Sequence, residues 1–111
     1  MKMFRCKACF YIQEGEAAPD ICPKCGAPKE QFEELNSSSA LLIERARKSN
    51  ELLTKAMTLL KELENTTREG KEDNLDPGCL NLFRRMEDCS LLLTSMIKAE
   101  IQSHIIKNKW G

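Results

Sequence analysis

The sequence predicts a small metal-bound domain of short β-strands and cysteine knuckles, followed by an all-α antiparallel two-helix hairpin. Three observations lead to this fold class. Two Cys-x-x-Cys pairs lie near the N-terminus, the composition changes near residue 35, and most of the remaining chain has a helical apolar repeat. The predicted domains are residues 1–35 for the metal site and residues 36–111 for the hairpin, with helices at about 38–69 and 77–108.

Four of the six cysteines and three of the four prolines lie before residue 36. The four early cysteines follow the spacing Cys6-x2-Cys9, twelve residues, Cys22-x2-Cys25. Each Cys-x-x-Cys turn forms a knuckle that directs two sulfurs to one side of a bend, so two facing knuckles build a tetrahedral four-thiolate site for Zn²⁺ or iron. Four thiolates in one place need a divalent ion to offset their charge. The predicted metal ligands are therefore Cys6, Cys9, Cys22 and Cys25.

The first predicted helix follows the polar stretch Asn36 to Ser39, in which any of the serines can cap the helix N-terminus. Placing residues at 100° intervals gathers its apolar side chains on one broad face. These are Leu41, Leu42, Ala46, Leu52, Leu53, Ala56, Met57, Leu59, Leu60 and Leu63. Gly70 is predicted to end this helix, and residues 70–75 are predicted to form a loop.

The second predicted helix begins at Asp76-Pro77, an N-cap residue followed by proline at the first helical position. Its apolar face holds Leu82, Phe83, Met86, Cys89, Leu93, Met96, Ile97 and Ile101. Each helix thus has an apolar face wider than a single partner helix covers. We therefore expect a homodimer in which two hairpins pair through their helices into a four-helix bundle. The alternative is a monomer whose metal domain folds against the hairpin.

Composition and charge exclude several classes of function. Lys plus Arg is 17 and Asp plus Glu is 17, so the zero net charge argues against a nucleic-acid partner and against electrostatic attachment to lipid. No segment reaches the roughly 20 apolar residues of a membrane span, and the N-terminus lacks the apolar run of a secretory signal. We therefore expect a cytoplasmic protein whose cysteines are reduced thiols.

The N-terminal segment resembles the rubredoxin-like domain of the rubrerythrins. The resemblance lies in the cysteine spacing, in Ala18-Pro19 before the second knuckle, in Ala27-Pro28-Lys29 after it, and in an aromatic residue seven positions beyond the last cysteine. It covers about the first 35 residues, and the hairpin is of unrecognised family. The resemblance implies one iron per chain, alternating between the ferrous and ferric states, with Phe4, Tyr11 and Phe32 packed around the site.

One residue departs from the family pattern. The family usually has glycine directly after the second cysteine, where the chain turns with a positive φ, and this chain has Phe10. A side chain in that conformation costs about 1 kcal/mol and weakens the inference of a tuned redox site. Structural Zn²⁺ therefore remains the alternative to iron.

Rubrerythrins also contain a di-iron four-helix bundle, which requires inward-facing carboxylates and Glu-x-x-His motifs. This chain has no Glu-x-x-His, so we infer that the resemblance is restricted to the rubredoxin-like part. Glu100 and His104 lie within the second apolar face at i, i+4 spacing, which suits either a plain Glu–His hydrogen bond or a metal or proton-handling site. Cys89 is interpreted as a core residue, and Cys79 as a thiol whose pKa the helix N-terminus lowers.

The expected function is one-electron transfer through iron, with redox partner proteins that the sequence does not identify. No catalytic centre is evident, so the chain is expected to act as an electron carrier or a binding module. The alternative function is a structural zinc-ribbon module whose hairpin serves oligomerisation or partner docking.

Overall fold

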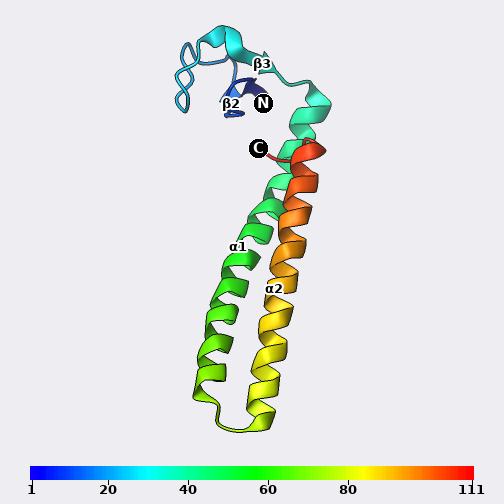
Figure 1. Ribbon diagram of the computed structural model, residues 1–111. Coiled ribbons are helices and arrows are strands. Elements are labelled where there is room, and N and C mark those ends of the chain that lie inside the picture. The colour runs from blue at the N-terminus through cyan, green and yellow to red at the C-terminus, as the bar shows by residue number, and fades with distance from the viewer. The chain divides into compact units, whose positions relative to one another are not determined.

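The computed structural model describes residues 1–111 and divides into two compact units. The first comprises residues 1–47 with residues 107–111, and the second comprises residues 48–106. Three strands and a short 3₁₀ helix come first, followed by two long helices (Figure 1). The predicted fold class is confirmed: a small strand-and-knuckle domain precedes a helical hairpin.

The three strands form one antiparallel sheet in the order β2-β1-β3. They are β1 (Lys2–Cys6), β2 (Ile12–Gly15) and β3 (Phe32–Glu34), with the 3₁₀ helix η1 (Lys29–Gln31) before β3. In the register, Phe4 lies opposite Gln13 and Cys6 lies opposite Phe32. Because side chains alternate along a strand, Phe4 and Cys6 share one face of β1, and Met3 lies on the other.

The apolar core of the first unit lies on the Met3 face of the sheet. Met3 packs with Ala40 and Ile43 from the start of α1, and Ile12 and Leu35 flank this cluster. So small a core buries little apolar surface, which is typical of domains that rely on a metal for part of their stability.

Helix α1 (Ser37–Asp73) begins at a side-chain cap. The Asn36 Oδ1 atom accepts a hydrogen bond from the Ser39 backbone N–H at 2.8 Å. The prediction that a serine caps this helix is therefore wrong, because Asn36 precedes the first helical residue and reaches the third N–H.

The predicted end of α1 at Gly70 is also wrong. The helix continues to Asp73, and Asn74 adopts a positive φ of 46° with its N–H bonded to the Gly70 carbonyl. Gly70 serves a different purpose: a Cβ built there would lie 2.5 Å from three carbons of the Phe83 ring. The glycine allows the aromatic ring to lie directly against the α1 backbone, and asparagine supplies the left-handed residue that ends the helix.

Helix α2 (Pro77–Ile106) starts where the sequence predicts. The Asp76 Oδ1 atom accepts a bond from the Cys79 N–H at 2.7 Å, and Pro77 occupies the first helical position. Over residues 48–106, α1 and α2 lie side by side and run antiparallel (Figure 1). Neither helix has an apolar stretch of the length that crossing a membrane requires.

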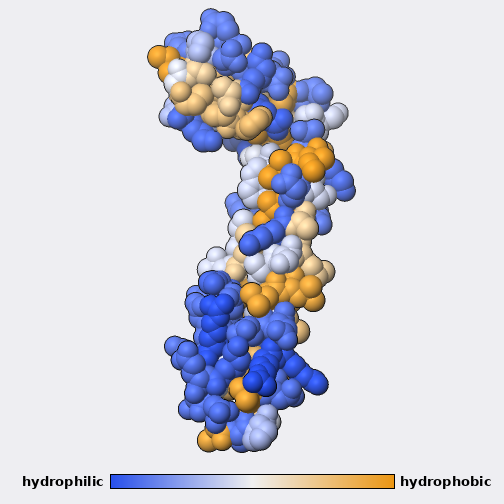
Figure 2. Space-filling model, in the orientation of Figure 1, coloured by the Kyte–Doolittle hydropathy of each residue, from blue (hydrophilic) through white to orange (hydrophobic).

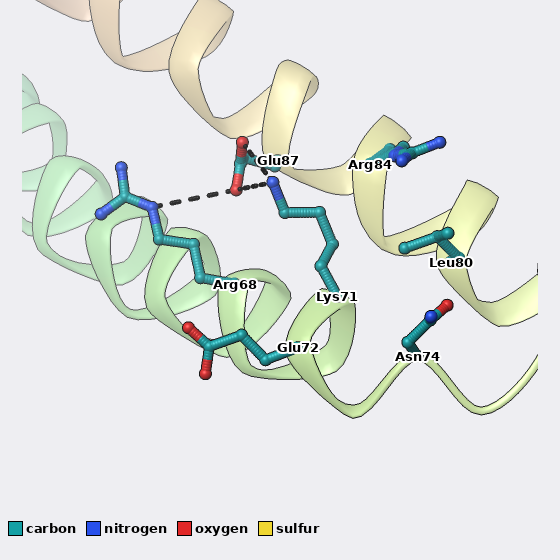
Figure 3. Close-up of a pocket in the computed structure, with 7 residues that line it drawn as sticks. All are labelled: Arg68, Lys71, Glu72, Asn74, Leu80, Arg84 and Glu87. Carbon is teal, nitrogen blue, oxygen red and sulfur yellow. Dashed lines mark hydrogen bonds and ion pairs between the residues drawn. The ribbon is translucent and has the colours of Figure 1, made fainter.

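The seam between the two helices of the second unit is lined mainly by small and polar side chains. Thr67 and Ser90 are almost fully buried, as are Asn50 and Glu64. At the turn end, the Glu87 carboxylate lies 3.0 Å from the Lys71 Nζ atom and 3.8 Å from the Arg68 Nε atom (Figure 3). Sequence reasoning missed these ion pairs, because a half-buried carboxylate on one helix is predictable only once its partner on the other helix is known.

Candidate metal centre

The two cysteine knuckles have the same backbone hydrogen-bond pattern. In the first, the Phe10 N–H donates to the Cys6 carbonyl at 2.8 Å and the Cys6 N–H donates to the Tyr11 carbonyl at 2.8 Å. In the second, the Gly26 N–H donates to the Cys22 carbonyl at 2.9 Å and the Cys22 N–H donates to the Ala27 carbonyl at 2.8 Å. The knuckles are therefore equivalent turns that start at the first cysteine of each pair.

Phe10 adopts the backbone conformation of the glycine that it replaces. Its φ is 67°, close to the 76° of Gly26 at the equivalent position. The Phe10 side chain is 73% exposed, so no packing contact of comparable size offsets the strain of a left-handed non-glycine residue. The departure from the family pattern therefore leaves the geometry of the first knuckle intact. Its consequence is a cost in conformational free energy at Phe10.

The four predicted ligand sulfurs come together in one site. The Sγ atoms of Cys6, Cys9, Cys22 and Cys25 all lie within 4.8 Å of one another. Two of the distances join the knuckles, at 3.7 Å for Cys6 to Cys25 and 3.6 Å for Cys9 to Cys22. A tetrahedron with metal–sulfur bonds of about 2.3 Å has edges of about 3.8 Å. The thiolate set therefore fits one tetrahedral ion, either iron or zinc.

Cys9 and Cys22, whose sulfurs face each other across the site, have pKa values shifted in opposite directions. The Tyr11 backbone N–H lowers the pKa of Cys9, but burial and the surrounding thiols outweigh that bond and raise the pKa to about 12. Burial raises the pKa of Cys22, but the N–H groups of Cys25 and Lys24, with the neighbouring thiols, outweigh burial and lower it to about 7. Four crowded thiols thus cannot all ionise unless a cation balances their charge.

In each knuckle the first cysteine is buried and the second is more accessible. Cys6 and Cys22 are buried, whereas Cys9 is half-buried and Cys25 is exposed. The Lys24 Nζ atom donates to the Cys9 carbonyl at 3.2 Å and so joins the rims of the two knuckles. Two ligand residues therefore lie at or near the protein surface, within reach of a docked partner.

The predicted aromatic residues lie next to this site. Phe32 is opposite Cys6 in the sheet, and Phe4 shares the Cys6 face of β1. The Tyr11 hydroxyl donates to the Gln13 Oε1 atom at 2.8 Å. All three aromatic side chains are half-buried.

Fold and site together define a rubredoxin-like metal domain. Comparison with known proteins identifies the family that this segment matches. Residues 4–33 match the family described as the rubrerythrin rubredoxin-like domain. A reverse rubrerythrin-1 of Clostridium acetobutylicum is 54% identical over 35 residues, or 32% of this chain and 19% of that protein. A rubrerythrin of Nitratidesulfovibrio vulgaris is 50% identical over 30 residues, or 27% of this chain and 16% of that protein.

These similarities confirm the resemblance inferred from the cysteine spacing. They cover the metal domain alone, since the family match ends at residue 33. The matching segment spans less than a fifth of the length of each relative. No solved structure matches the chain. The family match does not include the helical hairpin.

Glu100 and His104, the second candidate pair, belong to a hydrogen-bonded group in the hairpin. The His104 Nε2 atom lies 3.0 Å from the Glu100 Oε1 atom, and the Nδ1 atom lies 2.5 Å from the Asn50 Oδ1 atom. Only one carboxylate and one imidazole meet here, and the third member is an amide. This arrangement is the Glu–His hydrogen bond of the simpler interpretation, extended across the seam to α1.

Two predictions for the remaining cysteines are wrong. Cys89 is exposed and does not belong to a core. The pKa of Cys79 is raised, because its thiol lies 3.7 Å from the Asp76 Oδ2 atom and the carboxylate disfavours a nearby thiolate. The capping aspartate therefore outweighs the effect of the helix N-terminus that the sequence suggested.

Proposed function

We propose that the protein is a small electron carrier whose rubredoxin-like domain holds one iron. The observation that carries this proposal is the equivalence of the two knuckles in a segment that matches the rubrerythrin rubredoxin-like domain. Iron bound by four thiolates would supply a one-electron couple between the ferric and ferrous states. A flavin-containing reductase is the class of donor proposed, with a redox protein as the acceptor.

The chain's own residues support this role in three ways. Cys6, Cys9, Cys22 and Cys25 would hold the ion, and backbone N–H groups of the knuckles point at the Cys9 and Cys22 sulfurs. Such bonds stabilise negative charge on sulfur and so favour the reduced state. The exposure of Cys25 gives an electron a short path to the surface. The proposed location is the cytoplasm, where none of the six cysteines would form a disulfide.

Structural zinc is the second candidate, because a tetrahedral four-thiolate site of this size suits Zn²⁺ equally well. In that case the knuckles would stabilise the first unit, and the hairpin would supply the function as an assembly surface. The length of the helices, 37 and 30 residues, favours this candidate because an electron carrier does not need them.

The test is a visible absorption spectrum and elemental analysis of protein purified without added metal. We expect a red protein with about one iron per chain that dithionite bleaches and air restores. The matched controls are Cys25→Ser, which should lose the colour, and Cys79→Ser with Cys89→Ser, which should keep it. If the protein contains zinc and refolding with ferrous iron gives no reversible red form, electron transfer is ruled out.

A further inference from the structure

Each helix of the hairpin has two stripes of side chains, one of mixed polarity that lines the seam and one mainly apolar stripe beside it. The stripe that lines the seam repeats at alternating steps of three and four residues. On α1 it consists of Asn50, Leu53, Met57, Leu60, Glu64, Thr67 and Lys71, and on α2 of Leu80, Phe83, Glu87, Ser90, Thr94, Ile97, Ile101 and His104. All of these side chains are buried or half-buried.

A second stripe on each helix has the same spacing and is largely exposed. On α1 it consists of Leu52, Ala56, Leu59 and Leu63, and on α2 of Leu82, Met86, Cys89, Leu93 and Met96. At 100° per residue, each second stripe is rotated by about 100° from the seam of its own helix. Because the helices are antiparallel, both rotations lead to the same side of the hairpin. The two stripes form one surface, which we call the Leu59–Leu93 face.

The exposed apolar area of this face is comparable to the largest apolar patch of a typical monomer, about 300–600 Å², and such a patch is often functional. Five of its large apolar side chains are exposed, namely Leu52 (56%), Leu59 (54%), Leu82 (57%), Leu93 (45%) and Met96 (57%). At about half exposure each, they present on the order of 400 Å² of apolar surface, the size at which a patch indicates an interaction. Figure 2 shows apolar side chains interrupting the polar surface along the hairpin.

The area also fits the requirement of a dimer. A standard-size protein interface buries about 800 Å² on each partner, and homodimer interfaces are about 65% apolar. The five side chains with their half-buried neighbours Ala56, Leu63 and Met86 supply most of that apolar share. Away from this face, α1 presents Glu51, Thr58, Glu62, Asn65 and Glu69, whereas α2 also exposes Leu91 and Leu92.

The pattern of the face is self-complementary. The contacts of Asn50 with His104 and of Gly70 with the Phe83 ring fix which residues lie level with one another along the hairpin. In that register, Leu93 is level with the midpoint between Leu59 and Leu63. Consider a twofold axis that lies in the plane of the face, crosses the helices at right angles and passes Leu93. Such an axis places Leu59 against the second copy's Leu63, and Leu93 against its own equivalent.

We infer that the Leu59–Leu93 face is covered by a second copy of this chain, which packs antiparallel to form a four-helix bundle. An isologous contact of this kind needs one apolar, uncharged patch that matches itself, and the face has that property. The α2 stripe ends where Glu100 takes the next position, which sets one border of the contact. The inference does not depend on which metal the first unit binds.

The experiment is sedimentation equilibrium of the full metal-loaded chain at about 5–50 μM, with Leu59→Glu and Leu93→Glu as variants. We expect wild type at twice the 12.7 kDa chain mass. Each variant should raise the dissociation constant of the dimer by more than about 100-fold, because the twofold axis buries two unpaired carboxylates. Asn65→Glu adds the same charge to the polar side and should remain a dimer.

A second measurement guards against variants that fail to fold. Leu93→Cys, in a Cys79→Ser and Cys89→Ser background, should form a disulfide-linked dimer on mild oxidation, because the two copies of residue 93 meet at the axis. Ser95→Cys in the same background should not. A monomeric wild-type protein overturns the inference, and so does a dimer that Leu93→Glu leaves intact or Leu93→Cys fails to cross-link.

Discussion

The strained residue of the first knuckle allows a direct test of how backbone conformation sets metal affinity. Phe10 has a φ of 67°, and a left-handed L-residue costs about 1–2 kcal/mol, which glycine does not incur. Glycine also adds backbone freedom to the metal-free chain at a cost of about 0.5–1 kcal/mol. Because the Phe10 side chain is 73% exposed, its removal sacrifices little packing. Phe10→Gly should therefore stabilise the metal-bound knuckle by about 1 kcal/mol, or about fivefold in affinity.

The second knuckle provides the reciprocal change. Gly26 has a φ of 76°, and a Cβ there would meet nothing within 4 Å, so Gly26→Ala introduces backbone strain without a steric clash. We expect about fivefold weaker metal binding for this variant. Ala8→Gly is the control, since Ala8 has no positive φ and glycine there only adds flexibility, which should weaken binding slightly.

The assay is competition for Zn²⁺ between each variant and a colorimetric chelator at fixed pH. The three affinities should rank with Phe10→Gly above wild type, and Gly26→Ala below it. If Phe10→Gly binds Zn²⁺ no more tightly than wild type while Gly26→Ala binds it less tightly, the reasoning is refuted. The Phe10 side chain would then stabilise the knuckle by more than its conformation costs.

Two further predictions concern the hairpin. Gly70→Ala should destabilise it by about 1–2 kcal/mol in urea unfolding followed by circular dichroism, because the new Cβ would lie 2.5 Å from the Phe83 ring. In a Phe83→Ala background, Gly70→Ala should instead stabilise the hairpin by about 0.5–1 kcal/mol, the usual gain for alanine over glycine in a helix. If Gly70→Ala still destabilises the hairpin in that background, the steric explanation is wrong. The Cys79 N–H lowers the pKa of Asp76 below its ordinary 3.8, so its contribution to stability is complete above that value and is lost as the pH falls below it. Asparagine caps a helix without titrating, so wild type should lose stability relative to Asp76→Asn on acidification from pH 6 to pH 3. A stability difference that stays constant over this range would exclude the linkage.

Local chemistry was predictable wherever a short stretch of chain determines it. The cysteine spacing predicted the four sulfurs of one site because each knuckle is a turn closed by its own backbone bonds. The Asp76-Pro77 pair predicted the start of α2 because a cap requires only the residues of one helical turn. Phe10 was recognised as a departure from the family because a positive φ is a property of a single residue.

Only the tertiary structure decided how the broad apolar faces of the helices are divided. Periodicity identifies the apolar side of a helix, but it does not say which part of that side meets the partner helix. Asn50 and Ser90 lie in the seam, whereas Leu59 and Leu93 lie outside it. The buried polar groups have partners there, such as His104 for Asn50, and those pairings join residues far apart in sequence. Gly70 was misread for the same reason, because its role depends on an aromatic ring that only the folded hairpin brings to it.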